Sequence, residues 1–208
     1  MGSTAVDHFN ALSVSDWSGK QLESVQQEIT VHLCIAVPVN VWTPGLHEFR
    51  SDFLDESMLR IPPHITICEV QLKGREMETS WMSRIDELNG IGREVPAFSY
   101  RLSELFWDET KRVLFVCPQD DGDRFNWLKR TAQSILGVAS DLRDSRFPRL
   151  ALASKTGMGR LILEERFKEL NGEDLSLSYR ATEVEVYRKI RKDWYLNTTI
   201  PLKQSDEN

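Results

Sequence analysis

The chain has 208 residues, of which 40% are hydrophobic and 28% charged, which is the composition of a globular protein with one substantial core. Lys and Arg total 26 against 32 Asp and Glu, so the formal net charge is −6, and the sequence lacks the strongly basic balance of proteins that coat long duplex nucleic acids. No apolar run approaches the roughly 20 residues of a membrane span, and the N-terminus lacks a secretory signal pattern, so we expect a cytoplasmic protein without a membrane segment.

Three cysteines, Cys34, Cys68 and Cys117, lie in apolar, strand-like runs without a CxxC pair. An odd number of cysteines without paired spacing favours buried free thiols over disulfides or zinc ligands. We therefore expect a reducing compartment and no metal site.

Residues 1–30 are polar with weak periodicity, and we expect them to form a partly flexible extension before a single domain over residues 31–203 and a tail over 204–208. Within the domain, apolar runs and period-two alternation predict strands, whereas apolar residues at three- and four-residue steps predict helices. The expected strands are 31–38, 64–72, 98–105, 112–118, 149–153, 181–190 and 194–202. The expected helices are 46–54, 77–88 (stopped near residues 89–90), 125–136 and 161–170.

The stretch PPHITIC, residues 62–68, contains the most informative pattern. Its two prolines fix an extended backbone, and the alternation that follows predicts His64, Thr66 and Cys68 on one face of a strand, with Ile65, Ile67 and Glu69 on the other. A neighbouring imidazole and hydroxyl can hold a phosphate-like oxygen and move a proton. Taken alone, however, a histidine on a strand is more often a packed residue than a catalyst.

The order strand, proline, helix, proline, strand occurs twice in the chain. Val31–Pro38 leads through a helix to Pro63, and Arg112–Pro118 leads through a helix to Pro148. A repeat of this size predicts two similar lobes, each a small sheet covered by helices, that face one another across a cleft. The strands that follow Pro63 and Pro148 would then form opposite walls of that cleft.

A histidine-x-threonine strand after prolines, within such a repeat, resembles the two-histidine (2H) phosphoesterases, which include bacterial RNA-ligase-like cyclic phosphodiesterases. The resemblance covers roughly residues 31–202 and is best in the PPHITI motif. It implies an α+β fold of two pseudo-symmetric βα lobes with antiparallel-rich sheets facing a central cleft. It also implies a reaction without metal or cofactor, in which one histidine from each lobe acts as general base or acid toward a 2′,3′-cyclic phosphate or similar diester. A threonine or serine of each lobe would hold the phosphate oxygens.

His64 and Thr66 match the first motif of that family and are the expected catalytic residues. The second motif departs from the family pattern, because Arg149 stands in place of the histidine and Ala151 in place of the threonine. A guanidinium group, with a pKa above about 12, cannot act as a general acid, although it can bind a phosphate in bidentate fashion. Losing one proton-transfer group typically costs about 10²–10⁴ in rate. Arg149 is therefore expected either to clamp an anion or to form an ordinary salt bridge at the rim.

Lys155, Tyr187 and His32 are further candidates for substrate binding. Lys155 follows the second motif in a glycine-containing loop, Tyr187 lies in an alternating strand, and His32 lies on the first strand. Each also has a simpler interpretation, as a solvated lysine, a packed tyrosine and a hydrogen-bonded core histidine.

Three functions remain open at this point. The first is a phosphoesterase with His64 as its single acid or base, and the second is a repurposed isomerase or cyclase in which Arg149 clamps an anionic group. The third is a catalytically inactive protein that binds a ligand in the cleft. All three predict a monomer whose partner is a small anionic or nucleotide-like ligand, RNA ends included, rather than a membrane or a long duplex.

Overall fold

A computed structural model describes residues 30–39, 44–56, 58–73, 77–137, 148–154, 158–171 and 177–204. The elements are β1 (Thr30–Pro38), α2 (Pro44–Phe53), β2 (His64–Lys73), α3 (Met77–Glu94), β3 (Phe98–Asp108), β4 (Val113–Gln119), α4 (Arg124–Leu136), β5 (Leu150–Ala153), α5 (Arg160–Asn171), β6 (Leu177–Ala181), β7 (Glu183–Ile190) and β8 (Asp193–Pro201). Residues 1–29 of the expected extension and 205–208 of the expected tail lie outside the described residues. Within the described ranges, no helix is long and apolar enough to cross a membrane.

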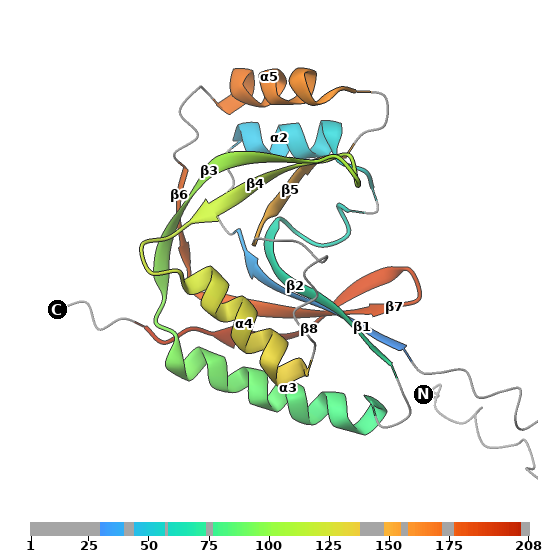
Figure 1. The fold of residues 1–208 in the computed structure, drawn as a ribbon, viewed down its shortest axis with the longest axis vertical. Helices are drawn as coiled ribbons and strands as arrows, with labels where there is room; N and C mark the ends of the chain where they lie inside the picture. The colour runs from blue at the N-terminus through green and yellow to red at the C-terminus, as the bar shows by residue number, and fades with distance from the viewer. Residues whose placement is uncertain are drawn as a thin grey trace, which may run out of the picture.

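The strands form two four-stranded antiparallel sheets (Figure 1). One sheet has the order β2-β1-β7-β8 and the other β5-β4-β3-β6. The sheets meet at an antiparallel bridge, in which the Thr66 N–H donates to the Arg149 carbonyl at 2.9 Å and the Arg149 N–H donates back at 3.4 Å. The α+β fold of two facing lobes, expected from the repeat and from the family resemblance, is confirmed.

Each helix of the repeat covers the sheet of the opposite lobe. The helix between β1 and β2, α2, packs on β5 and α5, whereas the helix between β4 and β5, α4, packs on β2 and α3. In Figure 1, α2 and α5 accordingly lie over the sheet of β3, β4 and β5, while α3 and α4 lie beside the other sheet. The two lobes are therefore interlocked, which holds the strands after Pro63 and Pro148 in fixed positions relative to one another.

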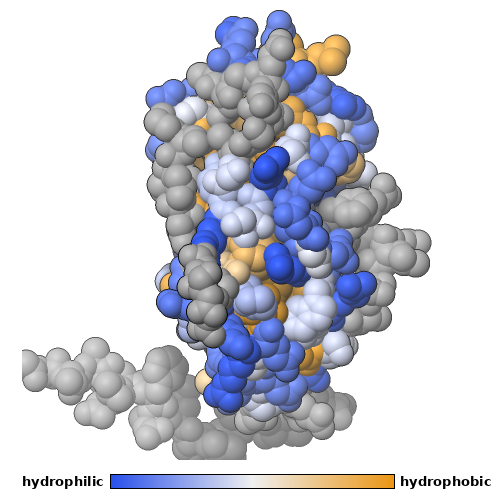
Figure 2. All heavy atoms as spheres, turned by 90° about the vertical axis from the view of Figure 1, so that its left-hand side faces the viewer, coloured by the Kyte–Doolittle hydropathy of each residue, from blue (hydrophilic) through white to orange (hydrophobic). Residues whose placement is uncertain are grey.

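A large core joins the helix-covered faces of both sheets to the apolar stripes of the helices. On the α2 side, the ring of Phe49 lies 4.8 Å from that of Phe53 and 5.1 Å, edge to face, from that of Phe167. On the face in Figure 2, hydrophilic side chains cover most of the surface and surround small apolar areas. The hydrophobic residues have thus largely been removed from water, which is the main force that holds the lobes together.

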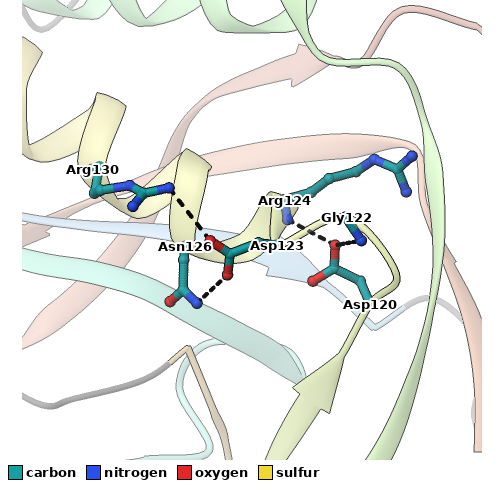
Figure 3. A network of polar contacts seen from close by, with 6 residues as sticks. All are labelled: Asp120, Gly122, Asp123, Arg124, Asn126 and Arg130. Carbon is teal, nitrogen blue, oxygen red and sulfur yellow. Dashed lines mark hydrogen bonds and ion pairs between the residues drawn. The ribbon is translucent and has the colours of Figure 1, made fainter.

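The N-terminus of α4 is fixed by two aspartates (Figure 3). The Asp120 carboxylate accepts the backbone N–H of Arg124 at 2.7 Å and that of Gly122 at 3.3 Å, so it satisfies donors that the first helical turn leaves open. Asp123 has a left-handed backbone and accepts the side-chain amide of Asn126 at 2.5 Å. These contacts hold in place the helix that carries two of the cleft-lining side chains.

Two stretches differ most from the sequence-based expectation. Strand β6, which ends at Ala181 and pairs with β3, was not expected, and the strand expected over residues 181–190 begins at Glu183 as β7, which pairs with β1. Helix α3 continues through residues 89–90 to Glu94. Gly92 permits this continuation, since a Cβ there would overlap the Pro201 carbonyl oxygen of β8, against which the helix lies.

Candidate active site

Strand β2 carries the PPHITI motif, and its pairing with β1 decides which side chains share a face with His64. The register skips Ile67, the extra residue of a β-bulge. Beyond the bulge, Glu69 therefore lies on the face of His64 and Thr66, and Cys68 packs in the main core. The expected alternation is confirmed for His64 and Thr66 and is wrong for Cys68 and Glu69, because one inserted residue reverses the faces of every position after it.

A cavity of about 530 Å³ lies where the two sheets meet. It is lined by residues of β1, α2, the segment before β2, β2, the β3–β4 turn, β4, α4, the segment around β5, β7 and β8. Its polar lining residues are Arg50, His64, Thr66, Glu69, Gln71, Lys111, Lys129, Gln133, Arg149 and Lys189. His64 and Thr66 thus share one cavity with Arg149 and Ala151, as the repeat predicts for the two walls of the cleft.

The imidazole of His64 is half-buried and held by its own backbone. Its Nδ1 lies 2.7 Å from the Pro62 carbonyl oxygen, which can only accept, so Nδ1 carries a hydrogen. Burial lowers the pKa of His64 to about 4; the Pro62 hydrogen bond opposes this shift, and the positive charge of Arg50 adds to it. At neutral pH the ring is therefore uncharged, with Nε2 as the nitrogen that can accept a proton.

Arg149 lines the cavity rather than pointing into solvent, with its side chain only 11% exposed. Its guanidinium carbon lies 4.1 Å from the centre of the Phe115 ring, and NH1 lies 4.0 Å from a carboxylate oxygen of Asp108. Of the two sequence-based alternatives for Arg149, the structure contains the salt bridge, and the role as an anion clamp stays a prediction. The cation–π contact with Phe115 supports the guanidinium group at the cavity wall.

Thr66 contacts the buried thiol of Cys34, which also lines the cavity. The Thr66 hydroxyl hydrogen-bonds the Cys34 side chain, but burial, together with the nearby Glu69 and Cys68, raises the Cys34 pKa far above its usual value. Cys34 is therefore a neutral, unreactive thiol at physiological pH. All three cysteines are free, with Cys34 and Cys68 buried as expected and Cys117 only half-buried.

The remaining sequence candidates lie around the cavity rather than in it, or outside the described residues. Tyr187 is buried; its ring centre lies 6.3 Å from that of His64, and its hydroxyl donates to Glu185 at 2.6 Å. Burial and the Glu185 carboxylate raise the Tyr187 pKa well above its usual value, so the hydroxyl stays protonated. His32 lies in β1 opposite Gln71 and Lys189 and does not line the cavity. Lys155 falls outside the described residues.

Several cavity residues were not recognised in the sequence, and Arg50 is the most informative. It follows Phe49 in the buried face of α2 and is only 2% exposed. The only signal for it is a charged residue one turn after Leu46, within an apolar stripe. Two others come from the β7–β8 hairpin, where the Lys189 ammonium lies 5.5 Å from the centre of the Trp194 ring at the cavity wall.

The cavity is basic although the chain is acidic. Among its lining residues in the described part of the chain are five Lys or Arg side chains and one acidic side chain, Glu69. Such a balance favours an anionic over a cationic ligand, because cationic side chains attached to both sheets and to two helices line one cavity. Within the described residues, no group of three or more His, Cys, Asp or Glu side chains has the arrangement of a metal site.

No family model matches the sequence, and no curated protein matches it by sequence. The fold, in contrast, resembles that of solved structures over nearly their whole length. The E. coli LigT structure in its apo form is 15% identical, with a TM-score of 0.55 over 86% of this chain and 100% of LigT. LigT in complex with 3′-AMP is 16% identical, with a TM-score of 0.53 over 85% of this chain and 100% of that one. A further crystal structure, of a phosphoesterase, is 14% identical, with a TM-score of 0.52 over 83% and 99% of the two chains.

LigT is a 2H phosphoesterase. The two facing antiparallel sheets, their crossed helices and the strand that follows Pro63 are therefore the architecture that the PPHITI motif predicts. The chain has the fold of the 2H phosphoesterases.

Proposed function

We propose that this protein binds a small phosphate ester, such as a nucleotide or an RNA end, and cleaves a phosphodiester slowly with His64 as its single general base. The observation that carries the proposal is the shared cavity, in which His64 and Thr66 of one lobe lie with Arg149 of the other. Its five cationic side chains supply the charge that a phosphate requires.

The role of each side chain in the proposed reaction follows from its protonation state and charge. Neutral His64 takes a proton from a water molecule at Nε2, and the water oxygen attacks phosphorus. The Thr66 hydroxyl donates to a phosphate oxygen, while the guanidinium of Arg149 stabilises the charge that develops. The bond from phosphorus to the ester oxygen then breaks, and the departing oxygen takes a proton from solvent.

The missing second histidine limits the rate. Arg149 cannot give a proton to the departing oxygen, and Ala151 provides no hydroxyl. We therefore expect turnover about 10²–10⁴ times slower than a site with two proton-transfer groups would support. The anionic product is retained by the same cations that bind the substrate.

The test is hydrolysis of 2′,3′-cyclic AMP, followed by ³¹P NMR with the protein in excess, together with calorimetric measurement of binding. We expect slow ring opening that His64→Ala reduces at least about 100-fold while nucleotide binding persists. His47→Ala, which removes an exposed histidine of α2, is the matched control and should hydrolyse like the wild type.

Two results would contradict the proposal in different ways. Binding without any ring opening would refute the catalytic part and leave a nucleotide-binding protein. No binding of the cyclic nucleotide or of its 2′- and 3′-monophosphate products would refute the phosphate-ester assignment itself.

A further inference from the structure

Arg50 is a buried cation whose charge is not matched by its surroundings. It lines the cavity from α2 and is 2% exposed. Its NH1 donates to the Ala151 carbonyl at 2.5 Å, but its buried Nε–H has no hydrogen-bond partner among the described residues. No ion pair to Arg50 occurs within the same ranges. A buried charge is costly unless it is paired, so this arrangement is expected where a ligand supplies the missing anion.

The position of Arg50 relates it directly to the altered second motif. Its hydrogen-bond acceptor is the backbone of Ala151, the residue that stands in place of the hydroxyl of the 2H family. Arg149 precedes Ala151 by two positions and lines the same cavity, and the charge of Arg50 also acts on His64. Arg50 and Arg149 thus line the same cavity, one from a helix and the other from the residue that precedes β5.

The two guanidinium groups differ in how far they are already neutralised. Arg149 has Asp108 at 4.0 Å, whereas Arg50 has no carboxylate within the described part of the chain. A singly charged diester offers one negative charge to this pair and its basic surroundings. A terminal phosphate, which is close to doubly charged at neutral pH, offers a second charge for Arg50.

We propose that Arg50 and Arg149 together form a subsite for a dianionic terminal phosphate, and that Arg50 makes the cavity select phosphate monoesters over cyclic diesters. This inference rests on the proposed function, because it assumes that the cavity binds a phosphate ester. The inference specifies the ligand class, phosphate monoesters, and assigns the preference for them to Arg50, which lies outside both motifs.

The experiment compares 3′-AMP, a dianion at about pH 7.5, with the monoanion 2′,3′-cyclic AMP by calorimetry. The wild type should bind 3′-AMP at least about tenfold more tightly. Arg50→Met, which keeps the length of the side chain but removes its charge, should weaken 3′-AMP binding on the order of 10- to 100-fold and cyclic AMP binding much less. Arg166→Met removes an equivalent charge from an exposed position of α5 and should change neither affinity.

Two further measurements keep the proposal testable if Arg50→Met does not fold. Arg50→Lys keeps the charge but lacks the planar fork, so it should retain part of the preference for 3′-AMP. In the wild type, the Arg50 Nε–H resonance should move downfield when 3′-AMP is added, because this donor gains an acceptor.

The failures of the two proposals are distinguishable. If the wild type binds neither nucleotide, the proposed function is wrong. If it binds both with equal affinity, if Arg50→Met or Arg50→Lys has the wild-type preference in full, or if the Nε–H resonance does not respond to bound 3′-AMP, the Arg50 subsite is wrong while the phosphate-ester assignment stands.

Discussion

His64 is predicted to remain uncharged when the pH is lowered from about 7.5 to 5.5. With the pKa of about 4 that burial produces, about 97% of the imidazole is still neutral at pH 5.5, whereas an imidazole with the ordinary value of 6.5 would be only about 9% neutral. A general base works in its neutral form, so this change in pH should reduce His64-dependent cleavage by only a few per cent. An unshifted histidine would lose about tenfold.

The assay is the pH titration of the His64 ring by NMR in a sample with ¹³C- and ¹⁵N-labelled histidine. The chain has four histidines, and His64→Gln identifies the signal by its disappearance. The midpoint should lie near 4 and should rise when inorganic phosphate is added, because a bound anion stabilises the imidazolium ion. A midpoint near 6.5 in the free protein would refute the argument that the cavity wall desolvates this ring.

The lowered pKa of His64 should also make the fold less stable at low pH. Because the folded-state pKa of His64 lies below its unfolded value, the unfolded chain binds more protons between about pH 6.5 and 4. His64 should therefore lower the stability of the fold progressively as the pH falls through this window. Below pH 4 the contribution should no longer change. The variant His64→Gln should lack this component of the pH dependence in denaturant unfolding.

Three further predictions concern the scaffold and the second motif. Gly92→Ala should destabilise the fold by more than about 1 kcal/mol, because its Cβ would overlap the Pro201 carbonyl. Gly90→Ala, with no neighbour within 4 Å, should instead stabilise α3 by about 0.5–1 kcal/mol. Urea unfolding in which both variants shift the free energy of unfolding in the same direction would contradict this pair of predictions. Asp120→Ala should cost about 1 kcal/mol through loss of the α4 cap, and an unchanged unfolding midpoint would contradict it. Combining Arg149→His with Ala151→Thr should raise cyclic AMP hydrolysis about 10²–10⁴-fold. An unchanged rate would contradict the argument that a missing proton donor limits hydrolysis.

The parts of the site that follow from local pattern could be predicted from the sequence. Two prolines and the alternation after them place His64 and Thr66 on one face of a strand, and the repeat brings Arg149 to the same cavity. The β-bulge at Ile67 could not be predicted, since it exists only in the register between β1 and β2. Period-two alternation assumes an unbroken ladder, so it assigned Cys68 to the wrong face.

Arg50 was missed for a related reason. Helical periodicity shows which residues of α2 are buried, but it does not show what they are buried against. The stripe of Leu46 and Phe49 predicts contact with a core, and a charged residue beside it is usually at the margin. Because α2 crosses to the sheet of the opposite lobe, Arg50 instead reaches the Ala151 backbone, 101 residues further along the chain.

The scaffold is nearly symmetric, whereas the chemical groups on it are not. With Thr66 bridged to Arg149, the antiparallel register would set His64 opposite Ala151, where a two-histidine site would have its second hydroxyl. Two histidines can exchange the roles of acid and base, but one imidazole with a pKa of about 4 beside fixed guanidinium groups can only accept a proton first. In the proposed mechanism the second lobe therefore contributes charge rather than proton transfer, so we expect the phosphate to bind while departure of the leaving oxygen is unassisted. Cleavage in such a site should be limited by the basicity of the leaving group, so we expect this cavity to hold a terminal phosphate better than it produces one.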